Sequence, residues 1–598
     1  MKQSRVSVLS VFAVVLAVLC LSAVVFAGSA NIQFNQVPSG MKKPGVYVEQ
    51  DLSLAARSLP SMERKVLVIG QRLDARVEPR IWQGGTLNDM TSSGSYNGTT
   101  IKQYRVKIAS VGAPDQYQFS TDNGATWSVA ASLSATPVEL SNGAMVNWGS
   151  VNDHAVGDEW RFKAYPAGTT AEAVPTQVFS DSQAAAAFGA GSTAHLMARA
   201  AMQANPYVSL TVVGLNDAAS NGVAASGTVT IANSATGSGS VRLYVGDQYA
   251  DAVIASGDTP TRIATNLSNA IAAKSDMPVT ASNTTGTITL TAKNEGLSGN
   301  EIGLGYELTP GIATTVTLSQ MSSGAVNPDI QTALTSVYAS RYHLIVTPFN
   351  NQTDLGALKT HVETVSNALE QRGSVGIYAT TGTLSGATTL AGQINSQRIV
   401  SAYVRYTSGT SQRRTPSWNL AAMTAATIAA DPDISGPVKN LNLSIAAPAI
   451  ADRLSRSEQE AALGAGVGPI EVGPGEAPRL VRLPLTYTLD TNNQTVFVDV
   501  HKVFGLDYVR DAAISAISAK APKKIVREGG LTTAQILRNI VLDVAYRCQQ
   551  AGVLTGVTSY KNQFLVEEDL QNTGQMNILM PSPVADGLYV VAVKQVLY

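Results

Sequence analysis

The chain has 598 residues, which is more than one hydrophobic core usually supports, so we expect about three to five domains. Its formal net charge of −1 gives no basis for binding nucleic acid, and its two cysteines, Cys20 and Cys548, exclude a disulfide scaffold. Charged residues make up only 14% of the chain, against roughly 25% in typical soluble domains, which favours large buried or subunit-contacting surfaces.

The first 30 residues are apolar and allow three interpretations. Lys2 and Arg5 precede the apolar run of residues 6–27, and small residues follow it. This pattern is typical of a secretory signal peptide, and the run is also long enough to span a bilayer as an uncleaved anchor. The third interpretation is a downstream start of translation, near Asn31. We expect no other membrane segment in the chain.

The next part of the chain predicts a linking segment, a strand and an all-β insert. Residues 31–60 begin polar and contain a short extended stretch, and the β-branched run at residues 65–70 predicts a buried strand. Over residues 77–175, alternating stretches are separated by Gly, Asn and Asp turns, which predicts a first β insert. An Ala-rich helical pattern at residues 182–205 and a buried strand at 208–213 follow.

Residues 214–325 predict a second β-rich insert, because Gly, Thr, Ser and Ala dominate and short strand patterns recur. One helical pattern, at residues 259–274, interrupts them. The four strand patterns of this insert are at residues 227–231, 241–245, 279–282 and 287–292.

An alternation of helices and strands follows and defines the predicted core. The helical patterns are at residues 330–340, 354–372 and 389–397, and the strand patterns are at 342–347, 374–380 and 399–405. This spacing predicts parallel strands with right-handed crossovers. We therefore expect an α/β fold in which residues 61–76, 176–213 and 326–463 form one doubly wound, mostly parallel sheet that carries both β inserts in its loops.

The remaining residues predict a C-terminal α+β domain and a terminal strand. Within residues 464–586 we expect strands at 480–488 and 495–500, helices at 503–520 and 532–551, and a strand-like stretch at 574–581. Residues 587–598 are extended and β-branched up to the last residue. An unpaired strand at a chain end promotes aggregation unless another chain pairs with it, so this segment predicts polymerisation.

Few motifs in the sequence indicate chemistry. Residues 120–127 match the Asp-box pattern of sialidase-like propellers, but the motif occurs once, so we interpret it as a hairpin turn. The five histidines lack the spacing of metal ligands, and neither a phosphate-binding loop nor a nucleophile elbow is present. We predict that the chain is not an enzyme and has no cofactor or metal site.

Several segments, in their order and spacing, resemble the tail sheath proteins of Mu-type contractile phages and related prophages. The resemblance covers roughly residues 31–76 and 176–598, and leaves out residues 1–30 and the first β insert. The stretches that carry it are residues 32–38 and 44–49, which resemble the N-terminal arm of the family, residues 205–213, and residues 481–487, 497–500 and 506–510.

This resemblance implies a structural subunit that polymerises as a sheath around an inner tube and contracts to drive the tube through a cell envelope. It implies further copies of the chain, the inner tail tube protein, and the baseplate and tail terminator proteins as partners, but no nucleic acid. The implied location is the virion tail, assembled in the bacterial host cytoplasm. The alternative, motivated by the apolar N-terminal segment, is an exported or surface-anchored β-rich adhesin.

The resemblance also implies which residues link neighbouring subunits. In such sheaths, N- and C-terminal arms complete a sheet in the C-terminal domain of a neighbour, and here that sheet would include residues 480–488 and 495–500. The arm residues are Val46, Tyr47 and Val48 near the N-terminus, and Leu588, Tyr589, Val590, Val591 and Val593 near the C-terminus.

The densest basic cluster lies beside the helix expected at residues 503–520. It consists of Lys520, Lys523, Lys524 and Arg527. One interpretation is a solvated helix end, where cations also suit the helix dipole. The other is electrostatic contact with an acidic inner tube through many weak, exposed pairs.

Overall fold

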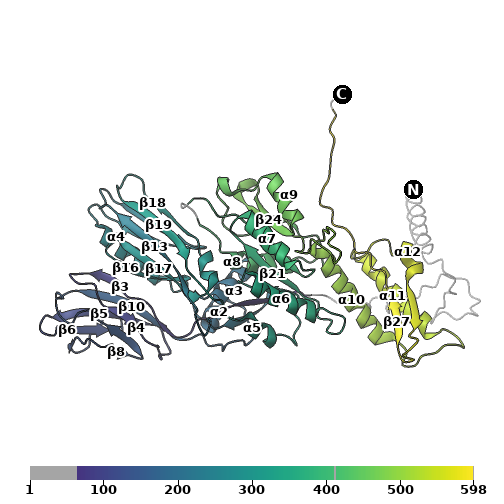
Figure 1. Ribbon diagram of the computed structural model, residues 1–598, viewed down its shortest axis with the longest axis horizontal. Coiled ribbons are helices and arrows are strands. Elements are labelled where there is room, and N and C mark those ends of the chain that lie inside the picture. The colour runs from purple at the N-terminus through teal and green to yellow at the C-terminus, as the bar shows by residue number, and fades with distance from the viewer. Residues whose placement is uncertain (1–62, 410–412, 597–598) are drawn as a thin grey trace, which may run out of the picture. The chain divides into compact units, whose positions relative to one another are not determined.

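The computed structural model describes residues 63–409 and 413–596, and a nine-stranded sheet lies at the centre of this part of the chain (Figure 1). Its five inner pairings, from β12 to β24, are parallel, and the outer strands pair antiparallel. In spatial order the strands are β11 (Thr176–Gln177), β12 (Ser209–Leu215), β1 (Lys65–Gln71), β20 (Leu344–Val346), β21 (Val375–Thr380), β22 (Ile399–Tyr403), β24 (Val467–Val472), β25 (Pro478–Arg482) and β23 (Lys439–Asn442).

Helices cover both faces of this sheet. Successive side chains of β1 point to opposite faces, so Val66 and Val68 join one apolar cluster while Leu67 and Ile69 join another. All four side chains are fully buried, as expected for a parallel sheet covered on both sides. The first cluster includes α3 (Thr193–Ala204) and α8 (Ser417–Ala429), and the second includes α5 (Ile330–Ser336) and α6 (Gln352–Val365).

Three further helices complete the central region. Two helices, α2 and α3, replace the single helix expected over residues 182–205, because Gly189 and Gly191 between them adopt positive φ angles of 87° and 83°. The bounds are α2 (Asp181–Phe188), α7 (Leu384–Ile394) and α9 (Arg456–Gly464).

Residues 76–165, called here the first β region, contain only strands and their connections. Their apolar core includes the rings of Trp82 and Trp160, whose centroids are 5.1 Å apart. One sheet contains β2 (Arg76–Val77), β3 (Ile81–Gly84), β5 (Lys102–Ser110), β6 (Gln116–Ser120), β7 (Ala131–Ser132) and β10 (Glu159–Tyr165), and a second contains β4 (Thr91–Ser93), β8 (Val138–Ser141) and β9 (Ala144–Asn147).

Residues 224–322, the second β region, surround a single α-helix, α4 (Pro260–Ala273), which was predicted. The helix begins where the side chain of Thr259 accepts a hydrogen bond from the amide of Arg262, and Pro260 stands at the first position, where a missing N–H costs nothing. The strands are β13 (Ala224–Ala232), β14 (Gly239–Val245), β15 (Gln248–Ile254), β16 (Val279–Thr284), β17 (Thr287–Glu295), β18 (Leu304–Leu308) and β19 (Thr315–Ser322).

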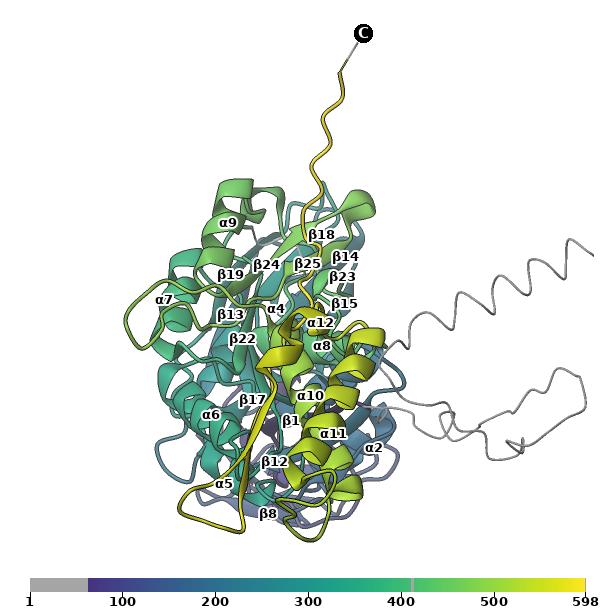
Figure 2. The ribbon, with the colours of Figure 1, turned by 90° about the vertical axis from the view of Figure 1, so that its right-hand side faces the viewer.

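The last part of the described chain consists of helices and one hairpin (Figure 2). Thr532 and Gln535 form a capping box at the start of α11, and α11 packs beside α10. The elements are α10 (Val500–Lys520), α11 (Thr533–Gln550), α12 (Val557–Tyr560), β26 (Leu565–Glu568) and β27 (Met576–Leu579).

Helix α10 is joined to the central sheet by ion pairs. Arg398, beside β22, holds both carboxylate oxygens of Asp507 at 2.8 and 2.9 Å. Arg341, just before β20, holds Asp511 at 2.5 Å. The backbone of Gly373 passes close to Asp507, and an added Cβ there would lie 2.3 Å from the Asp507 Oδ2 atom.

Two expectations about the C-terminal region are wrong. Residues 495–500 form no strand: Asp499 is the N-cap of α10, and this stretch makes only isolated bridges, Leu489 to Thr495 and Pro484 to Asp499. Of residues 480–488, only those up to Arg482 are in a strand, β25. The sheet also continues past residue 463, where we expected the core to end, because β24 pairs with β22.

Candidate assembly surfaces

The C-terminal segment, residues 587–596, is extended but forms no strand with any described residue (Figure 1). Its apolar side chains are largely in solvent: Val590 is 80% and Val593 79% exposed. Leu588 and Val591 are exposed too. Exposed, β-branched, extended chain is normally covered or paired. The backbone is extended, but residues 587–596 form no strand within the described chain, so the pairing of this segment with another chain stays a prediction.

Tyr589 is the point where this segment is held. Its ring lies 3.6 Å from the guanidinium carbon of Arg482, and its phenolic oxygen is 3.2 Å from Nδ1 of His501. Burial, followed by the charge of Asp499, raises the pKa of Tyr589, so the phenol stays protonated. The segment is thus anchored at Tyr589 and free from Val590 onward.

The hairpin of β26 and β27 is a two-stranded sheet, with Leu565 opposite Leu579. Each of these leucines is more than half exposed, at 55% and 58%. Among the described residues neither strand has a second neighbour. A two-stranded sheet is marginal alone and accepts an added strand through its open backbone groups.

The sheet expected to receive the arms does not lie at residues 480–488. Strand β25 has β24 on one side and β23 on the other, so its backbone groups are already paired. Of this hairpin the sequence predicted only β27, within residues 574–581, because the four-residue strand β26 contains Glu567 and Glu568 and gives little strand signal. The N-terminal arm residues Val46, Tyr47 and Val48, like residues 1–30, lie outside the described residues.

The basic cluster is divided by ion pairs. Lys520 lies 3.4 Å from a carboxylate oxygen of Asp543 on α11, and Arg527 pairs with Glu568 on β26. Arg527 also holds the pKa of Glu568 below its ordinary value. Lys523 and Lys524 are exposed, and no described carboxylate pairs with them. Only these two lysines remain available to an outside partner.

The Asp-box motif closes the connection between β6 and β7. The carboxylate of Asp122 accepts hydrogen bonds from the Ser120 hydroxyl at 2.6 Å and from the amide and hydroxyl of Thr126 at 2.9 and 2.6 Å. These bonds hold the pKa of Asp122 well below its ordinary range. Trp127 packs under the ammonium of Lys107, at 4.0 Å. The predicted hairpin turn is confirmed, and the carboxylate is occupied by structural contacts.

The described residues contain neither a cluster of metal ligands nor a membrane-spanning helix. No group of three or more His, Cys, Asp or Glu side chains in residues 63–409 and 413–596 is arranged to hold a metal ion. Within the same ranges, each helix is too short or too polar to cross a membrane.

Comparisons with known proteins match the chain to tail sheath proteins. The family described as "Phage tail sheath protein central domain" matches residues 323–482, which contain the strands from β20 to β25. The Mu-like prophage FluMu tail sheath protein of Haemophilus influenzae is 29% identical over 428 residues, which cover 68% of this chain and 85% of the relative.

Two solved sheath tail proteins also align with the structure. That of Desulfitobacterium hafniense is 12% identical, with a TM-score of 0.37, and the alignment covers 67% of this chain and 88% of that one. That of Listeria innocua is 13% identical, with a TM-score of 0.38, and the alignment covers 70% and 91%. The family match and the Haemophilus relative confirm the resemblance seen in the sequence: residues 323–482 match the sheath central domain, and the chain is similar to a Mu-like tail sheath protein over 428 residues.

Proposed function

We propose that the chain is the structural subunit of a contractile tail sheath, which polymerises around an inner tube and contracts to drive that tube through a cell envelope. The observation that carries this function is the match of residues 323–482 to the sheath central domain, together with the Mu-like relative over 68% of the chain. Neither match points to the adhesin that residues 1–30 suggested. The role is mechanical and needs no catalytic site.

The architecture that we propose for this role is a doubly wound core with two inserted β domains. The first and second β regions occupy the inserts, at residues 77–175 and 214–325. We place the C-terminal domain after β25 rather than at residue 464, because β24 and β25 pair within the central sheet. This domain is then α10, α11 and the hairpin, and arms from neighbouring subunits complete it.

The proposed link between subunits is strand addition. The free part of the C-terminal segment, from Val590 onward, would pair along the β26–β27 hairpin of a neighbour and cover Leu565 or Leu579. The N-terminal arm with Val46, Tyr47 and Val48 would supply a second strand. Backbone hydrogen bonds of this kind keep subunits connected while the rest of each subunit moves.

The proposed partners are further copies of the chain, an inner tail tube protein, and baseplate and tail terminator proteins. Lys523 and Lys524 are the residues that we propose for contact with an acidic tube, because both are exposed and unpaired within the described chain. We place the protein in a virion tail that assembles in the cytoplasm of the bacterial host.

Proline substitution in the C-terminal segment tests strand addition directly. Val590→Pro with Val591→Pro removes two consecutive backbone donors, so one lost donor faces the acceptor strand in either register. Electron microscopy of the purified full chain should show tubes or rings, and the proline variant should remain as separate subunits.

The matched control is Val590→Thr with Val591→Thr, which keeps both donors and the β-branched shape. This variant should assemble like the unchanged chain. Tubes formed equally well by the proline variant would contradict strand addition. An unchanged chain that stays monomeric at high concentration would contradict the sheath function itself.

A further inference from the structure

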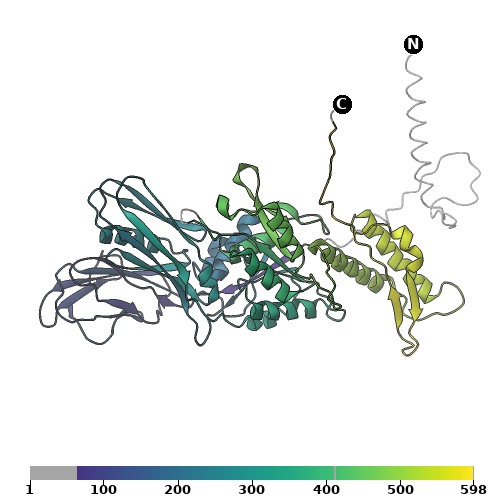
Figure 3. The same ribbon diagram turned by 45° about the horizontal axis from the view of Figure 1, so that its top comes forward.

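The first and second β regions meet along a seam that is fixed by buried hydrogen bonds (Figure 3). Asn283 of β16 is only 1% exposed, and its side chain bonds both backbone groups of Trp82 on β3, at 2.7 and 3.1 Å. Thr265 of α4 donates to the same Trp82 carbonyl at 3.1 Å. Buried polar pairs of this kind hold the two regions in one arrangement.

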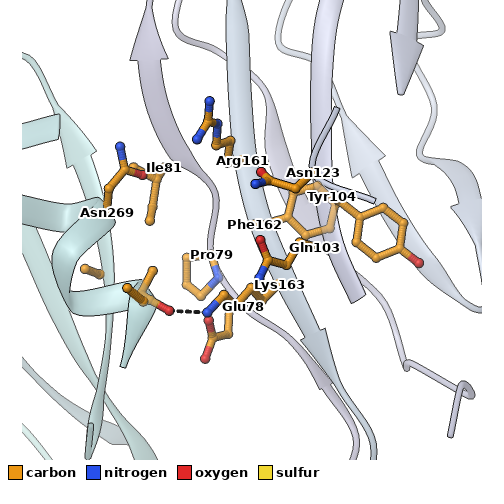
Figure 4. A pocket seen from close by; sticks show the side chains of 13 residues that line it. Glu78, Pro79, Ile81, Gln103, Tyr104, Asn123, Arg161, Phe162, Lys163 and Asn269 are labelled. Atoms are coloured by element: carbon orange, nitrogen blue, oxygen red, sulfur yellow. Dashed lines mark hydrogen bonds between the residues drawn. The ribbon is translucent and has the colours of Figure 1, made fainter. Parts of the chain in front are cut away.

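A cavity of about 300 Å³ lies beside this seam (Figure 4). This volume is at the lower end of the range of roughly 300–1,000 Å³ that is usual for small-ligand sites. Strands β5 and β10 and the Asp-box turn form one wall, and α4 forms part of the other. Its polar lining residues are Glu78, Gln103, Asn123, Arg161, Lys163 and Asn269.

Several of these polar groups lack protein partners. The side-chain amides of Gln103 and Asn123 are exposed and make no hydrogen bond with any described residue. Arg161 donates from Nε to Glu159 at 3.1 Å, while its two terminal nitrogens have no partner in the described chain. They remain available for a ligand.

Glu78 supplies the carboxylate of the cavity lining. It is 7% exposed, and its carboxylate accepts no hydrogen bond from a described residue. The nearest cations are Lys293 at 3.7 Å and Arg76 at 3.9 Å, both beyond hydrogen-bond distance. Glu78 lines the cavity, and the nearby terminal nitrogen of Arg76 is itself buried without a hydrogen-bond partner among the described residues. A hydroxyl group bound in the cavity can donate to the Glu78 carboxylate.

The charge around the cavity is positive. Glu78 faces Arg76, Lys163 and Lys293, and Arg161 stands at the opposite side of the lining. Burial lowers the pKa of Lys293 to about 8 and also lowers that of Lys163, which shows how closely the cations are enclosed. A bound anion would offset this excess.

A simple anion would not satisfy the whole lining. It would leave Glu78 facing a like charge and the two amides unused. The lining instead suits a molecule with one anionic group near Arg161 and several hydroxyls, which donate to Glu78 and exchange hydrogen bonds with Gln103 and Asn123. Pro79 and Ile81 supply an apolar surface for a carbon ring.

We propose that this cavity binds a saccharide unit that carries a carboxylate, such as a uronic acid of an acidic polysaccharide. The site lies outside the matched residues 323–482 and does not depend on sheath assembly.

Calorimetric titration of the purified full chain with D-glucuronic acid tests the site. D-glucose has the same ring without the carboxylate, and acetate has the carboxylate without the ring. We expect glucuronic acid to bind and each comparator to bind at least about tenfold more weakly, the factor that corresponds to one charge-assisted hydrogen bond.

Arg161→Ala should weaken glucuronic acid binding by about tenfold. The melting temperature should change little, because the protein contact that is lost is a partly exposed ion pair with Glu159. The control is Lys107→Ala, which removes the same charge from the same sheet outside the cavity, and it should bind normally. Absent glucuronic acid binding, equal binding of acetate, or equal loss in both variants would overturn the proposal.

Discussion

Two largely buried histidines, His361 and His343, make the stability of the fold depend on pH in the acidic range. Burial, and then the charge of Arg372, lowers the pKa of His361 from its ordinary 6.5 to about 4. Burial, followed by Arg341, lowers the pKa of His343 to about 4 as well. In the unfolded chain both rings take up a proton below about pH 6.5. The unfolded state therefore binds more protons between pH 6.5 and 4, and stability falls as the pH falls through this window.

His361→Gln should reduce the amount by which the free energy of unfolding falls as the pH is lowered. The His361 ring is 8% exposed, and its pKa falls from 6.5 to about 4. Once the pH is below both values, this shift corresponds to a loss of about 3 kcal/mol in the free energy of unfolding. Urea unfolding at pH 7.5 and at pH 4.5 would give the free energy of unfolding of both proteins. Equal losses in the variant and the unchanged chain would contradict this assignment.

The sequence did not distinguish among the residues that it predicted for the terminal arm. Tyr589 was one apolar arm residue among five, and the structure separates it from Val590 because its ring meets Arg482, a residue of the central sheet. Likewise, Lys520 and Arg527 were predicted as part of one exposed cluster. Their partners, Asp543 and Glu568, come from α11 and β26, and no local pattern could have paired them.

At the scale of elements, the joint between α10 and the central sheet depends on a glycine. Gly373 leaves room for Asp507, whose carboxylate is fixed by Arg398 and does not move aside at low cost. Gly373→Ala should therefore lower the free energy of unfolding by about 1–3 kcal/mol, the usual cost of overpacking.

The control for this substitution is Gly356→Ala in α6, where an added Cβ meets no atom within 4 Å. It should stabilise the chain by about 0.5–1 kcal/mol, because alanine favours a helix more than glycine does. Thermal melting of both variants measures the difference. A destabilised Gly356→Ala, or an unaffected Gly373→Ala, would contradict the effect assigned to the space around that glycine.

Strongly patterned elements were predicted well, and the failures have identifiable causes. The run at residues 65–70 lies within β1, and the run at residues 374–380 overlaps β21, because short, mainly apolar runs of this length favour buried strands. Helix α8 was missed since nearly all of its residues are buried, which removes the polar face that marks a helix. The strand expected at residues 495–500 was overridden by the N-cap of α10 at Asp499.

At the scale of the whole molecule, the sequence located the parts but not their limits. The parallel alternation indicated the central sheet, yet β24 and β25 were assigned elsewhere because the Gly/Pro-rich stretch at residues 464–475 is typical of a domain boundary. The acceptor for the terminal arm could not be derived at all, since in our proposal the two pairing strands belong to different copies of the chain.

Contact with an inner tube should depend on two lysines rather than four. Lys523→Ala with Lys524→Ala should reduce co-assembly with the tube, particularly at low salt, and leave the melting temperature unchanged because neither side chain has an internal partner among the described residues. Sedimentation of mixed sheath and tube proteins would measure this. Arg527→Ala serves as the contrast, since it breaks the pair with Glu568 inside the subunit. Undiminished co-sedimentation of the double variant would exclude these lysines from the tube contact.

The unpaired C-terminal segment has a consequence for how such an assembly stops growing. A subunit that gives away one strand and receives another makes a head-to-tail contact, so two copies that pair still leave one donor and one acceptor unused. One unpaired C-terminal segment and one unpaired hairpin likewise remain at the two ends of every longer open row of subunits. A row that closes into a ring uses up both, but an open row can always add another subunit, so the contact itself does not set the length of the polymer. The length of the polymer therefore has to be set by other components, which bind the unpaired hairpin or the unpaired C-terminal segment at its ends.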